Sequence, residues 1–326
     1  MTDPQKPEQQ FSRDELRYRI ADAINDRLKT IPLLHATAKG AAHWLQHRRD
    51  VQAIKKTRHV MGMHSAPAAQ PTYNAASVGE LPMPPLEMRR LVGPTDLALY
   101  DNPTGELIYP YLPPESFHRF FDFGCGCGRV ARQLMLQRPR PELYVGIDLN
   151  APLIDWCNDN LHPVAPEFSF YHHDVFNVAL NPSRDKPLTA PFPAQDSQFT
   201  MVNAISVFTH LTERQAEYYL RECARILRPD GVLHASWFLF DKADHPMMDA
   251  SSNALYVSYT DPSAAAIFDR RWVRDTARAM GLTIFHVIAP TIRGYQWLVL
   301  MTRRKDVPEI ELPEDTAPRG IVPPRD

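Results

Sequence analysis

The sequence predicts an α/β fold, a doubly wound, mostly parallel sheet of seven strands with a terminal antiparallel hairpin, preceded by an N-terminal helical region. Two observations predict it. From about residue 117, short apolar runs alternate with helical segments, a pattern typical of a parallel sheet covered by helices on both faces. At the end, the runs LTIFHVIAP and YQWLVLMTR are joined only by the turn TIRG, so these two strands must pair antiparallel.

The elements follow one another in a regular order. The predicted strands are FHRFFDFG, ELYVGIDLN, FSFYHHDV, FTMVNAISVF and GVLHASWFLF, followed by the two strands of the hairpin. The predicted helices are RVARQLMLQR, PLIDWCNDNL, ERQAEYYLRECARIL and DRRWVRDTARAM. Each strand is short and rich in β-branched or aromatic residues, whereas each helix has apolar residues at helical spacing.

Residues 1–61 form the predicted N-terminal helical region. Apolar side chains fall on one face at helical spacing at Leu16, Ile20, Ala23, Ile24, Leu28 and Ile31. Ser12 and Glu15 make a capping-box pattern just before that run. The basic stretch KKTRH allows two interpretations, a solvated helical face or an arm for homodimerisation or partner docking.

The remaining boundaries come from composition. Residues 62–116 begin with a stretch rich in Pro, Ala and Ser and are predicted to be a linker or strap leading into the main domain. Residues 117–302 are predicted to be that domain. Residues 303–326 lack an apolar period and are predicted to be a disordered tail.

Composition limits the partners and the compartment. The 326 residues carry a formal net charge of −2, so a dedicated nucleic-acid binder is not expected and nucleic acid is not a predicted partner. The sequence has no run of about 18 apolar residues, and we therefore expect no membrane span. Four cysteines in a chain of this length do not make a disulfide framework, and a cytoplasmic location is the expectation.

The stretch FDFGCGCGRV, residues 121–130, lies at the turn from the first strand into the first helix. Ligands of doubly wound sheets bind beyond the carboxyl ends of the strands, and glycine there lets the backbone approach a ligand closely. Asp148, twenty residues after Gly128, ends the second strand and can bind a ribose diol. Together, the loop and Asp148 predict a ligand that carries an adenosine-like group. Arg129 stands where a dinucleotide fingerprint requires its third glycine, so the pyrophosphate fingerprint is not met.

FDFGCGCGRVARQL, YVGIDLN, YHHDVF, FTMVNAISVFTHL and LRPDGVLHASWF follow one another as in class I S-adenosylmethionine-dependent methyltransferases, and the sequence from about residue 117 to residue 302 resembles that family. The stretch PPLEMRRLVGPTD also looks like the lead-in of a bacterial subgroup. The resemblance implies a Rossmann-like fold, S-adenosyl-L-methionine as the cofactor, and methyl transfer. One departure is Phe199–Thr200, where the family often has Phe-Asp.

The resemblance also implies roles for individual residues. The methionine part of the cofactor would meet Asp122, Gly124, Gly126 and Gly128, with Cys125 between the glycines. Asp148, followed by Leu149, would hold the ribose. Asp174 would meet the adenine amino group, with Val175 packing nearby. The floor beside the sulfonium would be formed by Asn203, Ala204 and Ser206.

His210 follows the fourth strand in SVFTHL and is the candidate catalytic residue. A neutral imidazole there could accept a proton from a substrate hydroxyl, which typically contributes ~10²–10⁴ in rate. The competing interpretation is a residue that only fixes the loop before the next helix, with Thr212 as its cap and Gln215 as the partner of that cap.

Candidate substrate contacts come from less regular segments. Residues 239–268 form a long insertion after the fifth strand, and such loops are usually lids, binding loops or disordered segments. The candidates are His245, Met247, Tyr256 and Tyr259 in this insertion, and Arg293 and Tyr295 in the final turn. Packing or solvation explains each of them almost as well.

No metal site is expected. Cys125 and Cys127 lack a second cysteine pair at ligand spacing, and they are interpreted as small residues that fit a crowded turn. His172 and His173 lie beside the predicted pocket, and His43 and His47 share a helix face, but neither pair has an evident third ligand.

The sequence therefore predicts a methyltransferase. Asn-Ala-Ile-Ser at 203–206 differs from the D/N-P-P-Y pattern found where amino groups of bases or glutamine are methylated, which favours O-methylation of a small molecule or a glycan hydroxyl. Two alternatives stay open. One is a dinucleotide-dependent oxidoreductase, and the other is a non-catalytic cofactor-binding partner protein whose N-terminal helices carry the function.

Overall fold

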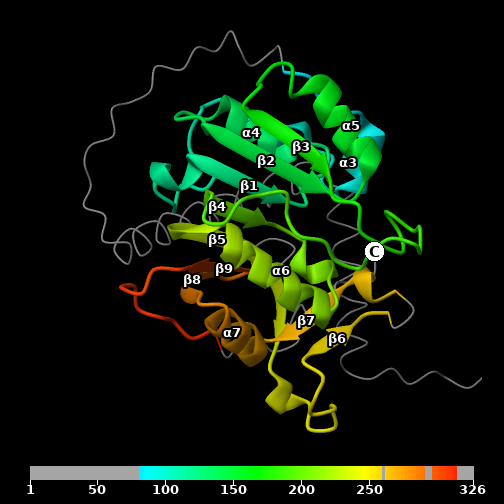
Figure 1. The fold of residues 1–326 in the computed structure, drawn as a ribbon, viewed down its shortest axis with the longest axis vertical. Coiled ribbons are helices and arrows are strands. Elements are labelled where there is room, and N and C mark those ends of the chain that lie inside the picture. Colours follow the sequence, from blue (N-terminus) through cyan, green and yellow to red (C-terminus); the bar gives the residue numbers. More distant parts are fainter. Residues whose placement is uncertain (1–80, 259–260, 291–295, 314–326) are drawn as a thin grey trace, which may run out of the picture. The chain divides into compact units, whose positions relative to one another are not determined.

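The computed structural model describes residues 81–313, except 259–260 and 291–295 (Figure 1). The predicted helical region 1–61, its proposed role in dimerisation or docking, and the first part of the strap lie outside the described residues. The domain boundaries expected from the sequence stay predictions.

Five parallel strands form the centre of the sheet, in the order β3-β2-β1-β4-β5. They are β1 (Arg119–Phe123), β2 (Leu143–Asp148), β3 (Phe168–His172), β4 (Phe199–Ala204) and β5 (Leu227–Phe240). The order reverses between β1 and β4, so the loops after these two strands diverge and leave a crevice at the carboxyl edge. The predicted doubly wound architecture is confirmed.

The terminal hairpin is confirmed as well. Helix α7 (Arg270–Ala279) leads into β8 (Thr283–Ile288), and β9 (Trp297–Thr302) pairs antiparallel with both β8 and β5. Because β9 is antiparallel to its two neighbours, β8 runs in the direction of the parallel strands, and its end lies at the carboxyl edge of the sheet.

The insertion at 239–268 adds two strands that the sequence does not predict. Within the described residues the sheet has nine strands. The additional ones are β6 (Ala254–Tyr256) and β7 (Ala266–Asp269), which pair antiparallel with each other. β7 also pairs parallel with the last residues of β5, Phe238–Phe240. Since β5 pairs with β9 only along Val232–Trp237, its distal end has an unpaired edge that β7 covers.

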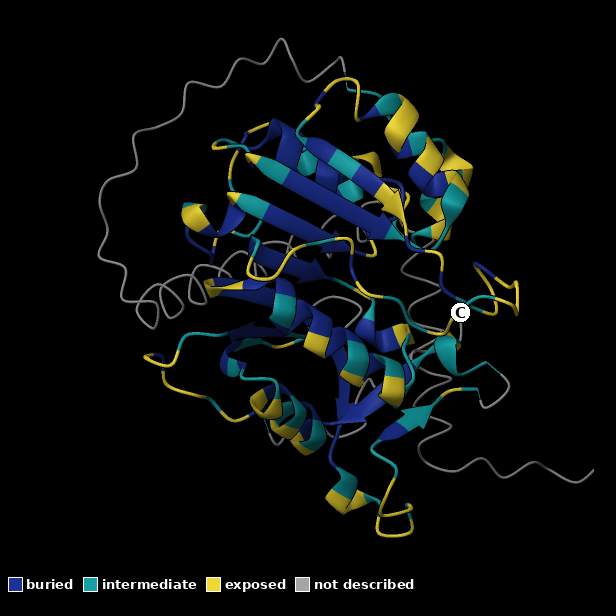
Figure 2. Cartoon of the chain, in the orientation of Figure 1, coloured by how far each residue is buried: buried dark blue, intermediate teal, exposed yellow. Residues whose placement is uncertain are grey.

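Alternate residues along the strands build two cores (Figure 2). One face of the sheet, including Phe121 and Val202, packs against α6 (Glu213–Ile226) and α7. The other, including Phe120 and Met201, packs against α4 (Arg129–Leu136) and α5 (Ala151–Asn160). Among the described helices, none combines the length and the apolar character needed to cross a membrane.

The segment before β1 packs on the sheet. It holds the short helix α3 (Leu86–Leu91) and two 3₁₀ helices, Leu97–Tyr100 and Pro114–Phe117. Tyr100 is fully buried in a cluster with Cys127 and Leu153, and Val92 and Met88 pack against that cluster. The described part of the predicted strap thus packs against the glycine turn.

The beginning of the predicted disordered tail is packed too. Val307 and Leu312 are buried, and the Ile310 N–H donates to the carbonyl of Ile284 on β8. The described tail residues, up to 313, therefore extend the folded part beyond the predicted boundary. Two isolated apolar residues anchor this segment, and no periodic pattern in the sequence reveals them.

Candidate functional site

The glycine turn between β1 and α4 has a backbone that only glycine adopts readily. Gly124, Gly126 and Gly128 have φ of 79°, 55° and 79°. A Cβ at Gly124 would lie 2.5 Å from a methyl group of Val207, and a Cβ at Gly126 would run into Val92. Both valines line the cavity described below, so the absence of side chains keeps the backbone at the cavity floor.

Asp148 ends β2 opposite this turn. One of its carboxylate oxygens accepts a hydrogen bond from Gly126 N–H at 2.9 Å, and the other accepts one from Asn150 N–H at 2.9 Å. Burial raises the pKa of Asp148, against the lowering effect of these backbone donors. Each carboxylate oxygen accepts one of these two backbone hydrogen bonds and can accept another, which suits a pair of vicinal hydroxyls.

Asp122, on β1, is the second carboxylate at the floor. It accepts hydrogen bonds from the Asn203 amide at 2.7 Å and from the Tyr144 hydroxyl at 2.8 Å. Burial raises the pKa of Asp122 to about 6, although both hydrogen bonds act to lower it. A buried acid that is ionised at neutral pH can bind a cationic group of a ligand.

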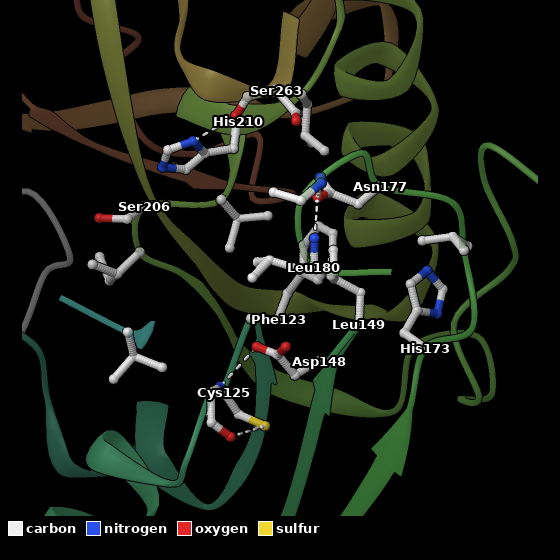
Figure 3. Close-up of a pocket in the computed structure, with 18 of the residues that line it drawn as sticks. Phe123, Cys125, Asp148, Leu149, His173, Asn177, Leu180, Ser206, His210 and Ser263 are labelled. Atoms are coloured by element: carbon white, nitrogen blue, oxygen red, sulfur yellow. Dashed lines mark hydrogen bonds between the residues drawn. The ribbon is translucent and has the colours of Figure 1, made fainter. Parts of the chain in front are cut away.

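These residues line one cavity of about 1020 Å³ at the carboxyl edge of the sheet (Figure 3). Ligand pockets usually measure roughly 300–1,000 Å³, so this cavity has room for a nucleoside-like cofactor together with a small acceptor. One wall is apolar, with Leu149, Leu153, Val175 and Leu180. Such a wall suits a planar base.

His210 lies in the short 3₁₀ helix Phe208–His210 after β4 and lines the same cavity. Its Nδ1 lies 2.8 Å from the carbonyl oxygen of Ser263, as Figure 3 shows. A carbonyl only accepts hydrogen bonds, so Nδ1 must carry the hydrogen. In the neutral ring the basic nitrogen is then Nε2. Thr212 and Gln215 form the predicted capping box of α6 two residues further on.

Ser206 precedes His210 in the same connection and has an unusual backbone. Its φ is 58°, in the left-handed region, where residues other than glycine store strain. The Ser206 N–H donates to the Ser236 hydroxyl at 2.7 Å, and both serine hydroxyls donate to the side-chain oxygen of Gln296. These three bonds hold the turn after β4 against β5 and the chain just before β9.

Most of the residues expected to bind the cofactor do line the cavity. They are Asp122, Gly124, Cys125, Gly126, Asp148, Leu149, Val175, Asn203 and Ser206. Gly128 and Ala204 do not. Gly128 is the N-cap of α4, and Ala204 is fully buried in the core. Their contribution is therefore to the shape of the turn and the strand.

Asp174 is also absent from the cavity lining. Its carboxylate lies 2.6 Å from the Lys186 ammonium group and accepts a hydrogen bond from Asn181 at 3.1 Å. The Lys186 hydrogen bond, as the main cause, lowers its pKa. Contact between Asp174 and an adenine amino group, implied by the family resemblance, stays a prediction and would require this ion pair to rearrange.

The candidate substrate residues are more dispersed. His245, Met247 and Tyr256 line a separate cavity of about 750 Å³ in the insertion, and Pro262 lines both cavities. The Tyr256 hydroxyl accepts a hydrogen bond from the Glu213 N–H at the start of α6. Tyr259, Arg293 and Tyr295 lie outside the described residues.

Sequence reasoning missed several cavity residues. They include Val92, Asn177, Ser263 and Gln296, and no sequence pattern marks these individual residues as part of a site. Arg129, at the start of α4, could have been found from the sequence, because its positive charge directly follows the glycine turn. Among the described residues that line the cavity it is the only lysine or arginine. Across the described chain, no group of three His, Cys, Asp or Glu side chains could hold a metal ion.

The residues present fit S-adenosylmethionine, the cofactor that the family resemblance implies. The side-chain-free turn at Gly124 and Gly126 leaves the backbone exposed to the ligand. Asp122 offers an anionic partner for an ammonium group, and Asp148 offers acceptors for ribose hydroxyls. The wall at Leu149 and Val175 offers apolar contact for adenine.

Comparisons with known proteins agree with this site. A family model for a methyltransferase domain matches residues 121–235. The curated ribosomal RNA small subunit methyltransferase C of Hahella chejuensis is 24% identical over 190 residues, 56% of this chain and 51% of that protein. The chain therefore spans about half the length of this curated relative.

Similarity to solved structures is low. The O-methyltransferase NcsB1 from neocarzinostatin biosynthesis, solved with S-adenosylmethionine and 2-hydroxy-5-methyl naphthoic acid, has a TM-score of 0.39 at 14% identity, over 59% of this chain and 50% of that chain. The PH0226 protein from Pyrococcus horikoshii OT3 has a TM-score of 0.40 at 15% identity, over 58% and 83%. The family model covers the glycine turn, Asp148, β4 and the first part of β5, so this part of the chain is similar to the methyltransferase domains of that family.

Proposed function

We propose that this protein transfers the methyl group of S-adenosylmethionine to a hydroxyl group of a small molecule or a glycan, with His210 as the general base. The observation that carries the proposal is the hydrogen bond from His210 Nδ1 to the Ser263 carbonyl. It leaves the basic Nε2 on a histidine that lines the same cavity as Asp122 and Asp148.

Each side chain has a defined task in this reaction. Asp148 holds the ribose, and Asp122 holds the methionine end of the cofactor. When bound, the cofactor supplies an electrophilic methyl group and a neutral thioether as its leaving group. His210 Nε2 accepts the proton of the acceptor hydroxyl, while the Ser263 carbonyl stabilises the positive charge that develops on the ring. Val92 and Val207 keep apolar surface over the turn and limit the access of water.

The cavity lining favours a compact acceptor over a nucleic acid. The ionisable lining includes three aspartates, Asp122, Asp148 and Asp261, and the single guanidinium of Arg129. Nucleic-acid sites depend on several cations that contact phosphates. The curated relative acts on ribosomal RNA by its name, so RNA belongs in the acceptor screen as the competing class.

Cofactor binding is the first test. We expect S-adenosylhomocysteine to bind in isothermal titration calorimetry and NADH and NADPH not to bind. Asp148→Ala should abolish binding because it removes the carboxylate that accepts hydrogen bonds from the ribose hydroxyls. Asp174 lies outside the cavity lining, and Asp174→Ala measures whether it contributes to cofactor binding. If only NADH or NADPH bound, the protein would be an oxidoreductase and the proposal of a methyltransferase would be wrong. If Asp148→Ala no longer bound S-adenosylhomocysteine but kept the biological activity, the protein would act as a non-catalytic partner protein.

The second test concerns the acceptor and the base. Methyl transfer from labelled S-adenosylmethionine is measured against hydroxylated small molecules, glycans and ribosomal RNA. On the accepted hydroxyl substrate, His210→Gln should lower kcat by ~10²–10⁴ and leave the affinity for S-adenosylhomocysteine unchanged. His162→Gln is the matched control, because His162 Nδ1 also bonds a backbone carbonyl, that of Phe168, away from the cavity. A kcat for His210→Gln equal to that of this control would remove His210 as the base.

A further inference from the structure

Beneath the floor of the cavity lies a buried polar network that the proposed reaction does not use directly. Asn203 on β4 lies between Asp122 and His234 of β5. His234 is fully buried, and its Nδ1 lies 2.8 Å from the Asn203 side-chain oxygen. Its Nε2 lies 2.7 Å from the hydroxyl of Tyr111, which comes from the segment before β1. The network thus joins three segments that are far apart in the sequence.

The chemistry of the partners sets the direction of each hydrogen bond. An ionised Asp122 only accepts, so the Asn203 amide nitrogen must face it and the Asn203 oxygen must face His234. His234 Nδ1 then carries the hydrogen and donates it, and Nε2 accepts from the Tyr111 hydroxyl. The Tyr109 hydroxyl donates to the same Asn203 oxygen at 3.1 Å. The series of hydrogen bonds therefore runs from Tyr111 through His234 to Asn203, whose amide nitrogen donates to Asp122.

This arrangement determines which end of the Asn203 amide meets the cavity acid. The two ends of a carboxamide have the same shape, and without a partner the group could rotate by half a turn. That rotation would place the amide oxygen against the Asp122 carboxylate, and two acceptors repel each other. The His234 N–H, at 2.8 Å, and the Tyr109 hydroxyl, at 3.1 Å, are donors that stabilise only the observed orientation, and the His234 bond is the shorter of the two.

We propose that His234 and Tyr111 are positioning residues, which act through Asn203 to hold Asp122 as an ionised acceptor for the ammonium group of the cofactor. The inference rests on the proposed function, since it concerns binding of S-adenosylmethionine. It predicts that His234, which does not line the cavity, controls the pH dependence of cofactor binding.

The charged and titratable groups around Asp122 come from several elements. Burial raises the pKa of Asp122 to about 6, and Asp148 of β2 adds to this effect. Asn203 of β4, Tyr144 of β2 and Arg129 of α4 act in the opposite direction. Burial and, after it, the charge of Asp122 raise the pKa of Tyr109, whose hydroxyl donates to Asn203. Loss of the Asn203 donor should raise the pKa of Asp122 further.

A protonated Asp122 no longer attracts an ammonium group, so the affinity for the cofactor should fall as the pH falls through the pKa of Asp122. S-adenosylhomocysteine carries the same ammonium group and tests this without turnover. The experiment is isothermal titration calorimetry with this ligand from pH 5 to pH 8. The variants are His234→Leu, Tyr111→Phe and His234→Gln, and circular dichroism checks that each is folded.

For His234→Leu we expect the acid limb of binding to move to higher pH, with a loss of affinity at pH 6 of roughly tenfold to a hundredfold, the range for a hydrogen bond to a charged group. At pH 8 the loss should be smaller. Tyr111→Phe should move the acid limb of binding in the same direction but by a smaller amount. If His234→Leu does not fold, Tyr111→Phe provides the test instead. His234→Gln, whose amide can donate to Asn203 and accept from Tyr111, should restore the profile.

The matched control is Thr302→Val, a buried position of β9 whose hydroxyl donates to the Gly231 carbonyl outside the network. It should lower thermal stability without moving the acid limb. If the variants keep the acid limb of the unmodified protein, or move it no more than Thr302→Val does, the inference is overturned. Failure of the unmodified protein to bind S-adenosylhomocysteine at any pH would instead overturn the proposed function.

Discussion

At two positions of the cavity, Gly124 and His210, a single atom determines the local geometry or chemistry. At Gly124 a hydrogen stands where any other residue would place a Cβ against Val207, and the backbone φ of 79° is one that other residues adopt at a cost. At His210 a single carbonyl oxygen, that of Ser263, selects which ring nitrogen stays basic. In the proposed reaction, one such contact would control the cofactor side of the cavity and the other the acceptor side.

Gly124→Ala should lose cofactor affinity and stability together. The left-handed backbone costs roughly 1–2 kcal/mol for a residue with a Cβ, and the contact with Val207 adds to that cost. Gly281→Ala is the control, because its φ of 76° is similar and its nearest atom is 4.0 Å away. Urea unfolding and titration with S-adenosylhomocysteine measure the two effects. Equal ligand affinity in both variants would contradict a role for the bare turn in binding.

The connection between β4 and α6 is the element that presents the proposed base. It contains the strained Ser206, the short helix Phe208–His210 and the capping box of Thr212 and Gln215. The cap satisfies N–H groups that the first turn of α6 would otherwise leave without partners. Because the capping residue Thr212 lies two residues after His210, the start of α6 limits how far the connection that carries His210 can move.

Thr212→Ala should lower the free energy of unfolding by about 1 kcal/mol, the usual cost of losing a side-chain N-cap. Thr212→Ser keeps the hydroxyl that accepts from Gln215 N–H and should stay close to the unmodified protein. Chemical denaturation followed by circular dichroism compares the two variants. If both unfolded at the same denaturant concentration, the cap would contribute nothing measurable.

At the scale of the whole molecule, buried histidines couple stability to pH. Burial, as the main cause, lowers the pKa of His173 to about 4 and that of His234 to about 3, against about 6.5 in an unfolded chain. As the pH falls from about 6.5 the unfolded chain therefore binds protons that the native chain does not, and the native state loses stability. Asp122, with its pKa raised to about 6, opposes this trend, because below that pH the native chain binds a proton that the unfolded chain still lacks.

His173→Gln should reduce the loss of stability at acid pH. The variant removes a side chain that protonates on unfolding, so its free energy of unfolding should fall less steeply between pH 6.5 and about pH 4.5 than that of the unmodified protein. Urea unfolding at a series of pH values measures the slope. Parallel slopes would show that His173 protonates equally in both states.

The parts of the fold and site that could be predicted are those in which neighbours along the chain carry the signal. The alternation of apolar runs and helical segments located the five central parallel strands and the hairpin, and the glycine turn and Asp148 located the cavity floor. Strands β6 and β7 were missed because both are short: β7 pairs with the distal end of β5, and β6 pairs only with β7. The contact of Asp174 with adenine stays a prediction, and the pairing of Asp174 with Lys186, twelve residues on, has no sequence pattern that could have revealed it.

The sequence by itself determined the fold class and a ligand with an adenosine-like group, since both depend on local patterns: residue periodicity, a left-handed turn that requires glycine, and a carboxylate at a strand end. The family resemblance added the identity of the cofactor. Only the tertiary structure decided how the site is tuned. The contact that sets the His210 tautomer joins residues 53 positions apart, and the contact that sets the Asn203 orientation joins residues 31 positions apart. Tyr111 and His234, which also bond, are 123 positions apart. The direction of a hydrogen bond depends on which groups meet in space, and the packing of the sheet determines that.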